Sequence, residues 1–225
     1  MNQTTEAPLF NKVVIIGVGL IGSSLAHNIR AHGLAREVVG VSRSAENRKQ
    51  IMELGLADSV TDDAAQAVVG ADCVLLCTAV GAYGPLAQQI APALSEGCIV
   101  SDVGSTKSSV IADVQPHMPD HATFVPAHPI AGTEQSGPGA GFESLFRDRW
   151  VILTPLPNTP RAPVEKIAAL WSACGAMIDE MEPGHHDKVL AATSHLPHML
   201  AYALVHQLSN LNDHEEIFRY AAGGF

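Results

Sequence analysis

Short apolar runs and amphipathic stretches alternate along most of the chain, and this alternation predicts its architecture. The apolar runs predict β-strands at residues 12–17, 37–42, 72–77, 98–102, 122–126, 150–155 and 175–181. Stretches with apolar residues three or four apart predict helices at 20–32, 45–54, 84–94 and 161–173. Strands that alternate with helices are typical of an α/β fold, in which a doubly wound, mostly parallel sheet is covered on both faces.

The pattern changes near the C-terminus. No strand is expected after Pro183, and residues 184–210 are helical in pattern with an interruption at Pro197. Residues 213–222 predict a further helix. The adjacent His185 and His186 are expected to be solvated in the first helical turn.

A domain boundary is expected at residue 182. The run 175–181 is expected to rejoin the main sheet, because it closes the alternating part of the chain. This assigns a dinucleotide-binding domain to 1–182 and the start of an all-helical domain to 183–225.

A glycine-rich turn follows the first expected strand and is the most informative stretch. The chain there reads V-V-I-I-G-V-G-L-I-G, a G-x-G-x-x-G motif between a strand and a helix. Gly17 permits the tight turn, Gly19 lets the backbone approach a pyrophosphate, and Gly22 lets helix and strand pack closely. Leu20 and Ile21 open a helix whose N-terminus attracts phosphate. The motif indicates a Rossmann-type dinucleotide site, although a plain strand–turn–helix also fits.

The end of the second expected strand bears on the choice of cofactor. In dinucleotide sites an acid about 20 residues beyond the glycines binds the ribose 2′-OH. Here the chain has Ser42, Arg43 and Ser44 and no acid. An arginine and serines suit a 2′-phosphate through charge-assisted hydrogen bonds. We therefore expect NADP, with NAD as the alternative; a surface arginine beside a helix-capping serine is the plainer interpretation.

Two more strand ends are expected to border the cofactor, since ligands bind outside the carboxyl ends of parallel strands. Thr78 follows the run 72–77, and Asp102 ends the run 98–102. Asp102 could equally cap the next helix. Asp62 and Asp63 are expected to cap a short helix at 64–69.

Two segments contain candidate catalytic histidines. His128 begins the Gly- and Pro-rich segment 127–147, whose length without a clear period favours a functional loop. A histidine there could act as general base. His195 and His198 are three apart and could share a helix face. That spacing also permits a metal pair, but no H-E-x-x-H motif occurs; we expect no metal.

Composition excludes several classes of partner. Hydrophobic residues make up 47% of the chain and charged residues 16%, which suits a protein with a buried core. The formal net charge is −10 without a basic tract, which argues against nucleic acid and anionic membranes. No apolar run approaches a membrane span, and the N-terminus does not resemble a signal peptide.

The cysteines indicate a reducing compartment. They form no C-x-x-C pair, and the two nearest are about 13 Å apart along a strand, too far to bridge. We therefore expect reduced thiols and a cytoplasmic protein. The four positions are Cys73, Cys77, Cys98 and Cys174.

Several motifs together resemble the prephenate/arogenate (cyclohexadienyl) dehydrogenase family of tyrosine biosynthesis. They are the glycine motif followed by S-S-L, then S-D-V-G-S-T-K, H-P-I-A-G-T-E-Q-S-G, T-S-H-L-P-H and the ending Y-A-A-G-G-F. The glycine motif is shared by many dehydrogenases, whereas the two histidine motifs are far more specific. The resemblance spans about residues 11–225.

The resemblance implies an NAD(P)-dependent oxidative decarboxylation. The substrate, prephenate or arogenate, loses a hydride to the nicotinamide and carbon dioxide as its ring becomes aromatic. His128 matches the base that takes the ring hydroxyl proton, and Ser105 matches the serine that orients it. Glu134 matches an acid at the substrate entrance, and His195 and His198 match the pair that faces substrate from the helical domain. A homodimer through that domain is also implied.

The resemblance also implies more chain than is present. In the family, further helices follow the G-G-F-like segment and supply an arginine for the substrate carboxylate, whereas this sequence stops at Phe225. We therefore interpret the sequence as truncated and expect cofactor binding with little turnover. Apolar residues are expected to be exposed and to drive association, namely Leu190, Leu196, Met199, Leu200, Leu204 and Leu208.

Two other functions remain open on the sequence. A β-hydroxyacid or imine reductase would need a catalytic lysine near residue 185, where Lys188 is the candidate. The S-H-L-P-H motif argues against that reading. A non-catalytic NAD(P)-binding fragment is the alternative from another class.

Overall fold

The computed structural model describes residues 7–221. Its chain divides into two compact units, Met1–Gly184 and His185–Phe225. The last residue of the expected helix 213–222, the end of the Y-A-A-G-G-F segment and residues 1–6 lie outside the described part.

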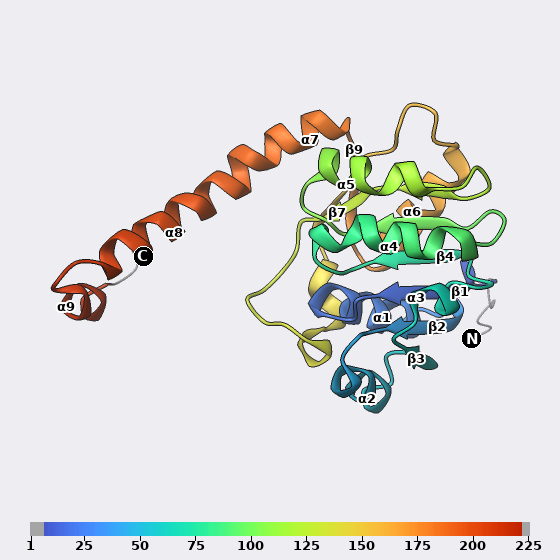
Figure 1. The fold of residues 1–225 in the computed structure, drawn as a ribbon, viewed down its shortest axis with the longest axis horizontal. Helices are drawn as coiled ribbons and strands as arrows, with labels where there is room; N and C mark the ends of the chain where they lie inside the picture. The colour runs from blue at the N-terminus through green and yellow to red at the C-terminus, as the bar shows by residue number, and fades with distance from the viewer. Residues whose placement is uncertain (1–6, 222–225) are drawn as a thin grey trace, which may run out of the picture. The chain divides into compact units, whose positions relative to one another are not determined.

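Six parallel strands form the main sheet of the first unit, in the order β3-β2-β1-β4-β5-β6 (Figure 1). They are β1 (Phe10–Ile16), β2 (Ala35–Val41), β3 (Ser59–Thr61), β4 (Cys73–Leu76), β5 (Ile99–Asp102) and β6 (Thr123–Val125). The order reverses at β1 and β4, and such sheets bind ligands in the crevice at the carboxyl ends of the strands there. The predicted doubly wound α/β fold is confirmed, with β3 as a strand that the apolar pattern missed.

Helices cover both faces of this sheet, and each face has its own core. Successive residues of β1 point to opposite faces, so Val13 and Ile15 join one buried cluster while Val14 and Ile16 join the other. The first cluster packs against α1 (Leu20–Ala31), α2 (Ala45–Glu53) and α6 (Arg161–Ala173). The second packs against α3 (Ala64–Ala67), α4 (Tyr83–Ile90) and α5 (Lys107–Val114), with α4 and α5 on the near side in Figure 1.

The three strands that follow β6 in the chain form a separate sheet. It has the order β7-β8-β9, with β7 (Ala127–Pro129) antiparallel to β8 (Trp150–Leu153) and β9 (Met177–Glu180) parallel to β8. The expectation that the run 175–181 rejoins the main sheet is therefore wrong. Pro126 separates β6 from β7, and because proline has no backbone N–H the ladder of the main sheet ends there.

Most expected helices lie within a few residues of their predicted ranges, but α5 was missed. Asp63 caps α3, as expected, through a hydrogen bond from the Gln66 N–H to its carboxylate at 3.1 Å. Single 3₁₀ turns complete the first unit at Val80–Ala82, Ala91–Ala93, Gln115–His117, Pro138–Ala140 and Glu143–Phe146.

The C-terminal helices run from α7 (Pro183–Leu190) through a π-helical turn (Ala191–His195) into α8 (Leu196–Ser209), followed by α9 (His214–Arg219). Pro197 lies in the first turn of α8, directly after the π turn, so the helix continues across a residue that has no N–H to donate. A proline ring clashes with the carbonyl four residues earlier, and the π turn at that place relieves the clash. The expected interruption is thus a change of helix type.

Burial in α7 differs from two expectations. His186 is fully buried rather than solvated, and its Nδ1 lies 2.9 Å from an Asp187 carboxylate oxygen. The carboxylate satisfies a ring nitrogen, which lowers the cost of burial. His185 is exposed, as expected. Leu190, expected to be exposed, lies in the last turn of α7 and is 5% exposed.

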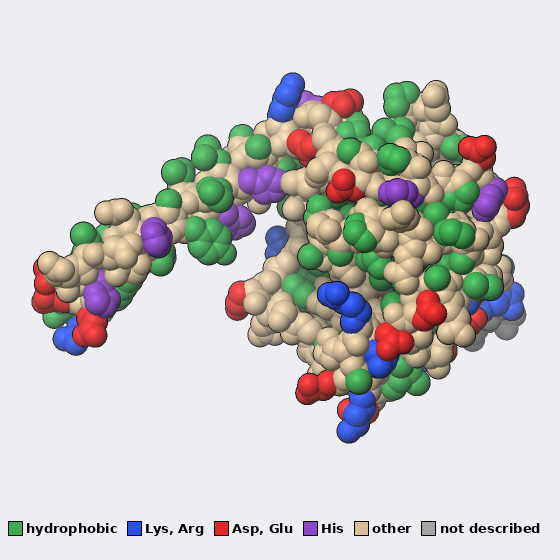
Figure 2. All heavy atoms as spheres, viewed as in Figure 1, with side chains coloured by type: hydrophobic (Ala, Val, Ile, Leu, Met, Phe, Trp, Pro, Cys, Tyr) green, Lys and Arg blue, Asp and Glu red, His purple; other side chains and the backbone are tan. Residues whose placement is uncertain are grey.

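Apolar side chains lie exposed along α8, where Figure 2 shows hydrophobic atoms beside histidines. Leu196, Met199, Leu200 and Leu204 are each about half exposed or more, as expected, and Leu208 is half-buried. Among the described residues, no helix has the length and apolar character that a membrane crossing requires.

Candidate active site

The glycine turn after β1 is shaped by close contacts at two of its three glycines. Gly17 has a φ of 95°, and a side-chain Cβ there would lie 2.7 Å from Thr78 Cγ2. A Cβ on Gly22 would lie 2.3 Å from the Gly17 carbonyl oxygen. At Gly19, in contrast, a Cβ would meet no protein atom within 4 Å. The fold therefore requires the first and third glycines, while the second faces open space.

That open space is a cavity of about 720 Å³ at the carboxyl ends of β1, β2 and β4. Six of the residues expected to bind cofactor line it: Gly17, Gly19, Ser42, Arg43, Ser44 and Thr78. Leu20, Ile21 and Gly22 form the first turn of α1 behind the glycine loop and do not line the cavity. The cavity thus lies at the strand reversal, where doubly wound sheets hold nucleotides.

The wall of the cavity fits a dinucleotide. The Thr78 Oγ1 atom is buried and has no hydrogen-bond partner among the described residues. A buried hydroxyl without a partner is costly unless a ligand or water satisfies it. The first turn of α1 has backbone N–H groups without partners inside the helix, and it begins at the open Gly19. The cavity, the free N–H groups of the first turn of α1 and the hydroxyl of Thr78 without a partner therefore lie together at the glycine motif.

The rim beside β2 combines a structural serine with an exposed arginine. The Ser44 hydroxyl accepts the Asn47 N–H at 3.2 Å and so caps α2, which is the plainer role considered for it. Arg43 is exposed and lines the cavity. Its side chain is free to meet a negatively charged group at this rim.

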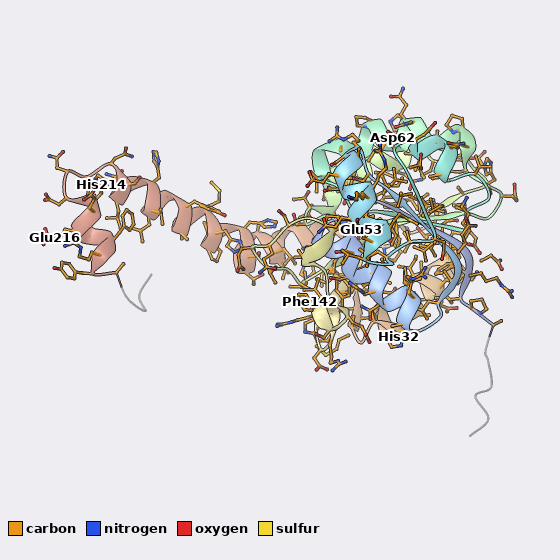
Figure 3. All side chains as sticks on the ribbon, turned by 90° about the horizontal axis from the view of Figure 1, so that it is seen from below. His32, Glu53, Asp62, Phe142, His214 and Glu216 are labelled. Carbon is orange, nitrogen blue, oxygen red and sulfur yellow. The ribbon has the colours of Figure 1, made fainter. Side chains whose placement is uncertain are left out.

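Arg48 and Asp62 also belong to this rim, although neither carries a motif by which the sequence could identify it. Arg48 Nη1 donates to the carbonyl oxygens of Ser42 and Arg43 at 2.8 and 2.9 Å, and it lies 3.2 Å from an Asp62 carboxylate oxygen. Asp62, labelled in Figure 3, lines the cavity and does not cap α3, because Asp63 has that role.

Asp102 is not in the cavity wall but in a buried ion pair. Its carboxylate lies 2.5 Å from the Lys107 ammonium, and both side chains are fully buried. It also accepts the N–H groups of Gly104 at 2.7 Å and Ala127 at 3.1 Å. Burial raises the pKa of the Asp102 carboxyl, and Lys107 and these two donors oppose that shift.

This ion pair connects the two segments that contain the proposed catalytic residues. Lys107 also donates to the Ala127 carbonyl at 2.7 Å, so both members of the pair bond to the residue before His128. Ser105 lies between them in the chain, exposed in the loop that joins β5 to α5. His128 is 9% exposed on β7. The loop of Ser105 is thereby fastened beside the strand of His128.

The other expected substrate residues lie on more open segments. Glu134 is exposed in the loop after β7, and Gly137 at the end of that loop lines the cofactor cavity. His195 ends the π turn and His198 lies in the first turn of α8, in the second compact unit. Within the described chain, no group of three or more His, Cys, Asp or Glu is arranged to hold a metal ion. The roles assigned to all these site residues stay predictions.

Known protein families account for most of the chain. Residues 25–180 match the model for the prephenate dehydrogenase nucleotide-binding domain, and residues 182–225 match that for the prephenate dehydrogenase dimerization domain. A cyclohexadienyl dehydrogenase of Zymomonas mobilis is 46% identical over 219 residues, covering 96% of this chain and 74% of that protein. A prephenate dehydrogenase of Bacillus subtilis is 34% identical over 227 residues, covering 100% of this chain and 60% of that protein.

Solved structures are similar over nearly the whole chain. The prephenate dehydrogenase of A. aeolicus, in complex with hydroxyphenyl propionate and NAD+, has a TM-score of 0.89 and 32% identity, covering 99% of this chain and 77% of that one. The arogenate dehydrogenase of Synechocystis has a TM-score of 0.80 and 29% identity, covering 95% and 76%. The similarity therefore includes both the sheet and the helical segment.

Proposed function

The chain belongs to the prephenate dehydrogenase family, and on this premise we propose that it uses NADP in preference to NAD, with His128 as general base. The family reaction is the NAD(P)-dependent oxidative decarboxylation of prephenate or arogenate in tyrosine biosynthesis. Support for NADP comes mainly from Arg43, an exposed cation in the wall of the glycine-lined cavity, where an NAD site usually has an acid.

Different residues are proposed for cofactor binding and for proton transfer. Gly19 and the first turn of α1 would receive the pyrophosphate, and Ser42 and Arg43 would meet the 2′-phosphate. When bound, the nicotinamide supplies the hydride acceptor. His128 takes the proton of the substrate's ring hydroxyl as the hydride departs, which suits an imidazole held in place by its surroundings. Ser105 orients that imidazole as a positioning residue.

Substrate would also be contacted by the loop after β7 and by the helical segment. Glu134 would lie at the entrance for substrate, and His195 and His198 would contact it from the helical segment. The boundary between the nucleotide-binding and helical domains would fall at 182, and the match of 182–225 to a dimerization domain supports a homodimer. The four cysteines are free thiols, which supports a cytoplasmic location.

Turnover measured with each substrate and each cofactor tests the function. Full-length protein, including any chain that follows residue 225, is assayed with prephenate and with arogenate, each with NADP and NAD, by following formation of the reduced cofactor. We expect turnover with at least one substrate, and a higher kcat/KM with NADP. Equal kcat/KM for the two cofactors would refute the NADP preference. Tight cofactor binding without turnover on either substrate would favour a non-catalytic module.

Replacing Arg43 tests the same preference by binding alone. Arg43→Ala should weaken NADP by about 1.5–3 kcal/mol, the range for a hydrogen bond to a charged group, and leave NAD nearly unchanged. Arg36 is the matched control, because it is an exposed arginine at the opposite end of the same strand. Isothermal titration calorimetry of both variants with both cofactors measures the difference.

A further inference from the structure

The charge of the cavity wall depends on a residue that does not line it. Among the described residues that line the cavity, Asp62 is the one acid and Arg43 the one base. An anionic group at this rim would be attracted by Arg43 and repelled by Asp62. The response of the rim to a phosphate therefore depends on what neutralises Asp62.

Arg48 lies where it can neutralise the Asp62 carboxylate. Its guanidinium lies 3.2 Å from the Asp62 carboxylate, and its side chain is 23% exposed whereas that of Asp62 is 62% exposed. The less exposed partner is the one behind the wall, where its charge is screened less by solvent. Arg48 thus offsets the negative charge of Asp62 without occupying the cavity.

Arg48 also fixes the backbone that contains Arg43. One nitrogen, Nη1, donates to the carbonyl oxygens of both Ser42 and Arg43, at 2.8 and 2.9 Å. These hydrogen bonds join the first turn of α2 to the segment after β2, so the position of the Arg43 side chain depends on them.

We propose that Arg48 is a positioning residue for cofactor specificity, which holds the Ser42–Arg43 segment and offsets the charge of Asp62 so that the rim accepts a 2′-phosphate. This inference rests on the proposed NADP preference. It assigns Asp62 the opposite effect, since its carboxylate disfavours the same phosphate. The two residues together set how strongly the rim distinguishes phosphorylated from plain ribose.

Adenosine 2′,5′-bisphosphate and AMP are suitable probes, because they differ only in the 2′-phosphate. Both are titrated by calorimetry, at low and high salt, into the unmutated protein, Arg48→Gln, Asp62→Asn and the double variant. Arg48→Gln should raise the Kd of the bisphosphate about tenfold, on the scale of lost charge-assisted hydrogen bonds, and leave that of AMP within about twofold. Asp62→Asn should lower the bisphosphate Kd by about two- to fivefold at low salt, since the pair is partly exposed. The double variant should recover part of the affinity.

Lys49→Gln is the matched control, because Lys49 is on the same helix, one residue further along, and is 77% exposed. It should leave both Kd values unchanged. Thermal unfolding of each variant shows whether α2 stays folded. Equal weakening of both probes by Arg48→Gln would overturn the inference and indicate a general structural role. Equal affinity of the unmutated protein for NADP and NAD would instead refute the NADP preference itself, so the two failures are distinguishable.

Discussion

Two regions of the first unit, the cofactor end and the chemical end, differ in how far their charged side chains are exposed to solvent. The cofactor end consists of residues at the carboxyl ends of β1, β2, β3 and β4: Gly17, Gly19, Ser42, Arg43, Asp62 and Thr78. The chemical end consists of residues on β5, α5 and β7 and their connecting loop: Asp102, Ser105, Lys107, Ala127 and His128. The cofactor end is an open cavity with its charges near solvent, whereas the chemical end has an ion pair in its interior.

The difference reflects what each region must do. A cofactor that binds and dissociates needs open space and backbone N–H donors. It also needs charged side chains that water can screen while no cofactor is bound. A proton acceptor must instead stay within hydrogen-bond reach of one hydroxyl. A buried ion pair contributes little net stability, but here each of its members also forms a hydrogen bond with Ala127, which joins the β5–α5 segment to β7. We infer that the buried pair serves position rather than stability.

The largest effect is expected from breaking the buried pair. Lys107→Met would leave the Asp102 carboxylate buried without its cation, and such a loss costs about 3–5 kcal/mol of unfolding free energy. Urea denaturation measures the change. Lys107→Met combined with Asp102→Asn should be less destabilising than Lys107→Met alone, because no unpaired charge remains and the amide oxygen still accepts from one of the two N–H groups.

An exposed pair provides the contrast for that experiment. Arg30 and Asp58 form an ion pair at 2.8 Å with side chains 41% and 43% exposed. Arg30→Met should cost at most about 1 kcal/mol, the usual range for surface pairs. A loss for Lys107→Met as small as that for Arg30→Met would remove the distinction between the two regions.

A smaller effect is expected from alanine at the glycine turn, and it should differ between two glycines. Gly22→Ala forces a Cβ against the Gly17 carbonyl and should cost about 1–3 kcal/mol of stability, as overpacking does. Gly19→Ala meets no protein atom, so it should cost about 1 kcal/mol or less. Its Cβ projects toward the cavity, and NADP should bind at least about tenfold more weakly. Denaturation and calorimetry on both variants would reveal whether this division holds; equal losses of stability would contradict it.

The smallest effect is expected at the cysteines. Burial raises the pKa of the Cys174 thiol to about 12, and burial together with the nearby Asp72 raises the pKa of Cys98 to about 12. Burial also raises the pKa of Cys73 and of Cys77, which lines the cavity. At pH 8 these thiols stay protonated, so iodoacetamide should modify none of them in the native protein.

Intact-mass measurement checks this expectation. The same protein unfolded in urea should add a label at every cysteine, because the thiol pKa values return to their ordinary range. Rapid labelling of Cys77 alone in the native protein would indicate that solvent in the cavity reaches its thiol, contrary to the burial that raises its pKa.

Local signals identified most of the main sheet and the cofactor end. The strand, glycine motif and helix at the start of the chain are encoded within a short window, and the structure has a cavity at that turn. Ser42 and Arg43 were found by counting along the chain, because their place depends only on the end of β2. Such features need no knowledge of distant contacts.

Features that depend on distant contacts were missed. Strand β9 has an apolar run like those of the main sheet, and nothing in its sequence indicates that it pairs with β8 instead. Lys107 begins α5, and its burial follows only from Asp102 and from Ala127, which is 20 residues further along. The ion pair of Arg48 with Asp62 joins α2 to the end of β3 in the same way. The chain order of these residues carries no sign of their proximity.

Cofactor binding and proton transfer belong to separate regions in the proposed function, and His128→Ala should therefore affect one without the other. NADP binding by calorimetry and turnover with the preferred substrate are measured on the same preparation of full-length protein. We expect a Kd for NADP within about twofold of the unmutated value and a kcat lowered by roughly 10²–10⁴, the span for loss of a general base. Ser105→Ala should give a smaller loss. Near-normal turnover of His128→Ala at every pH tested would show that His128 is not the general base.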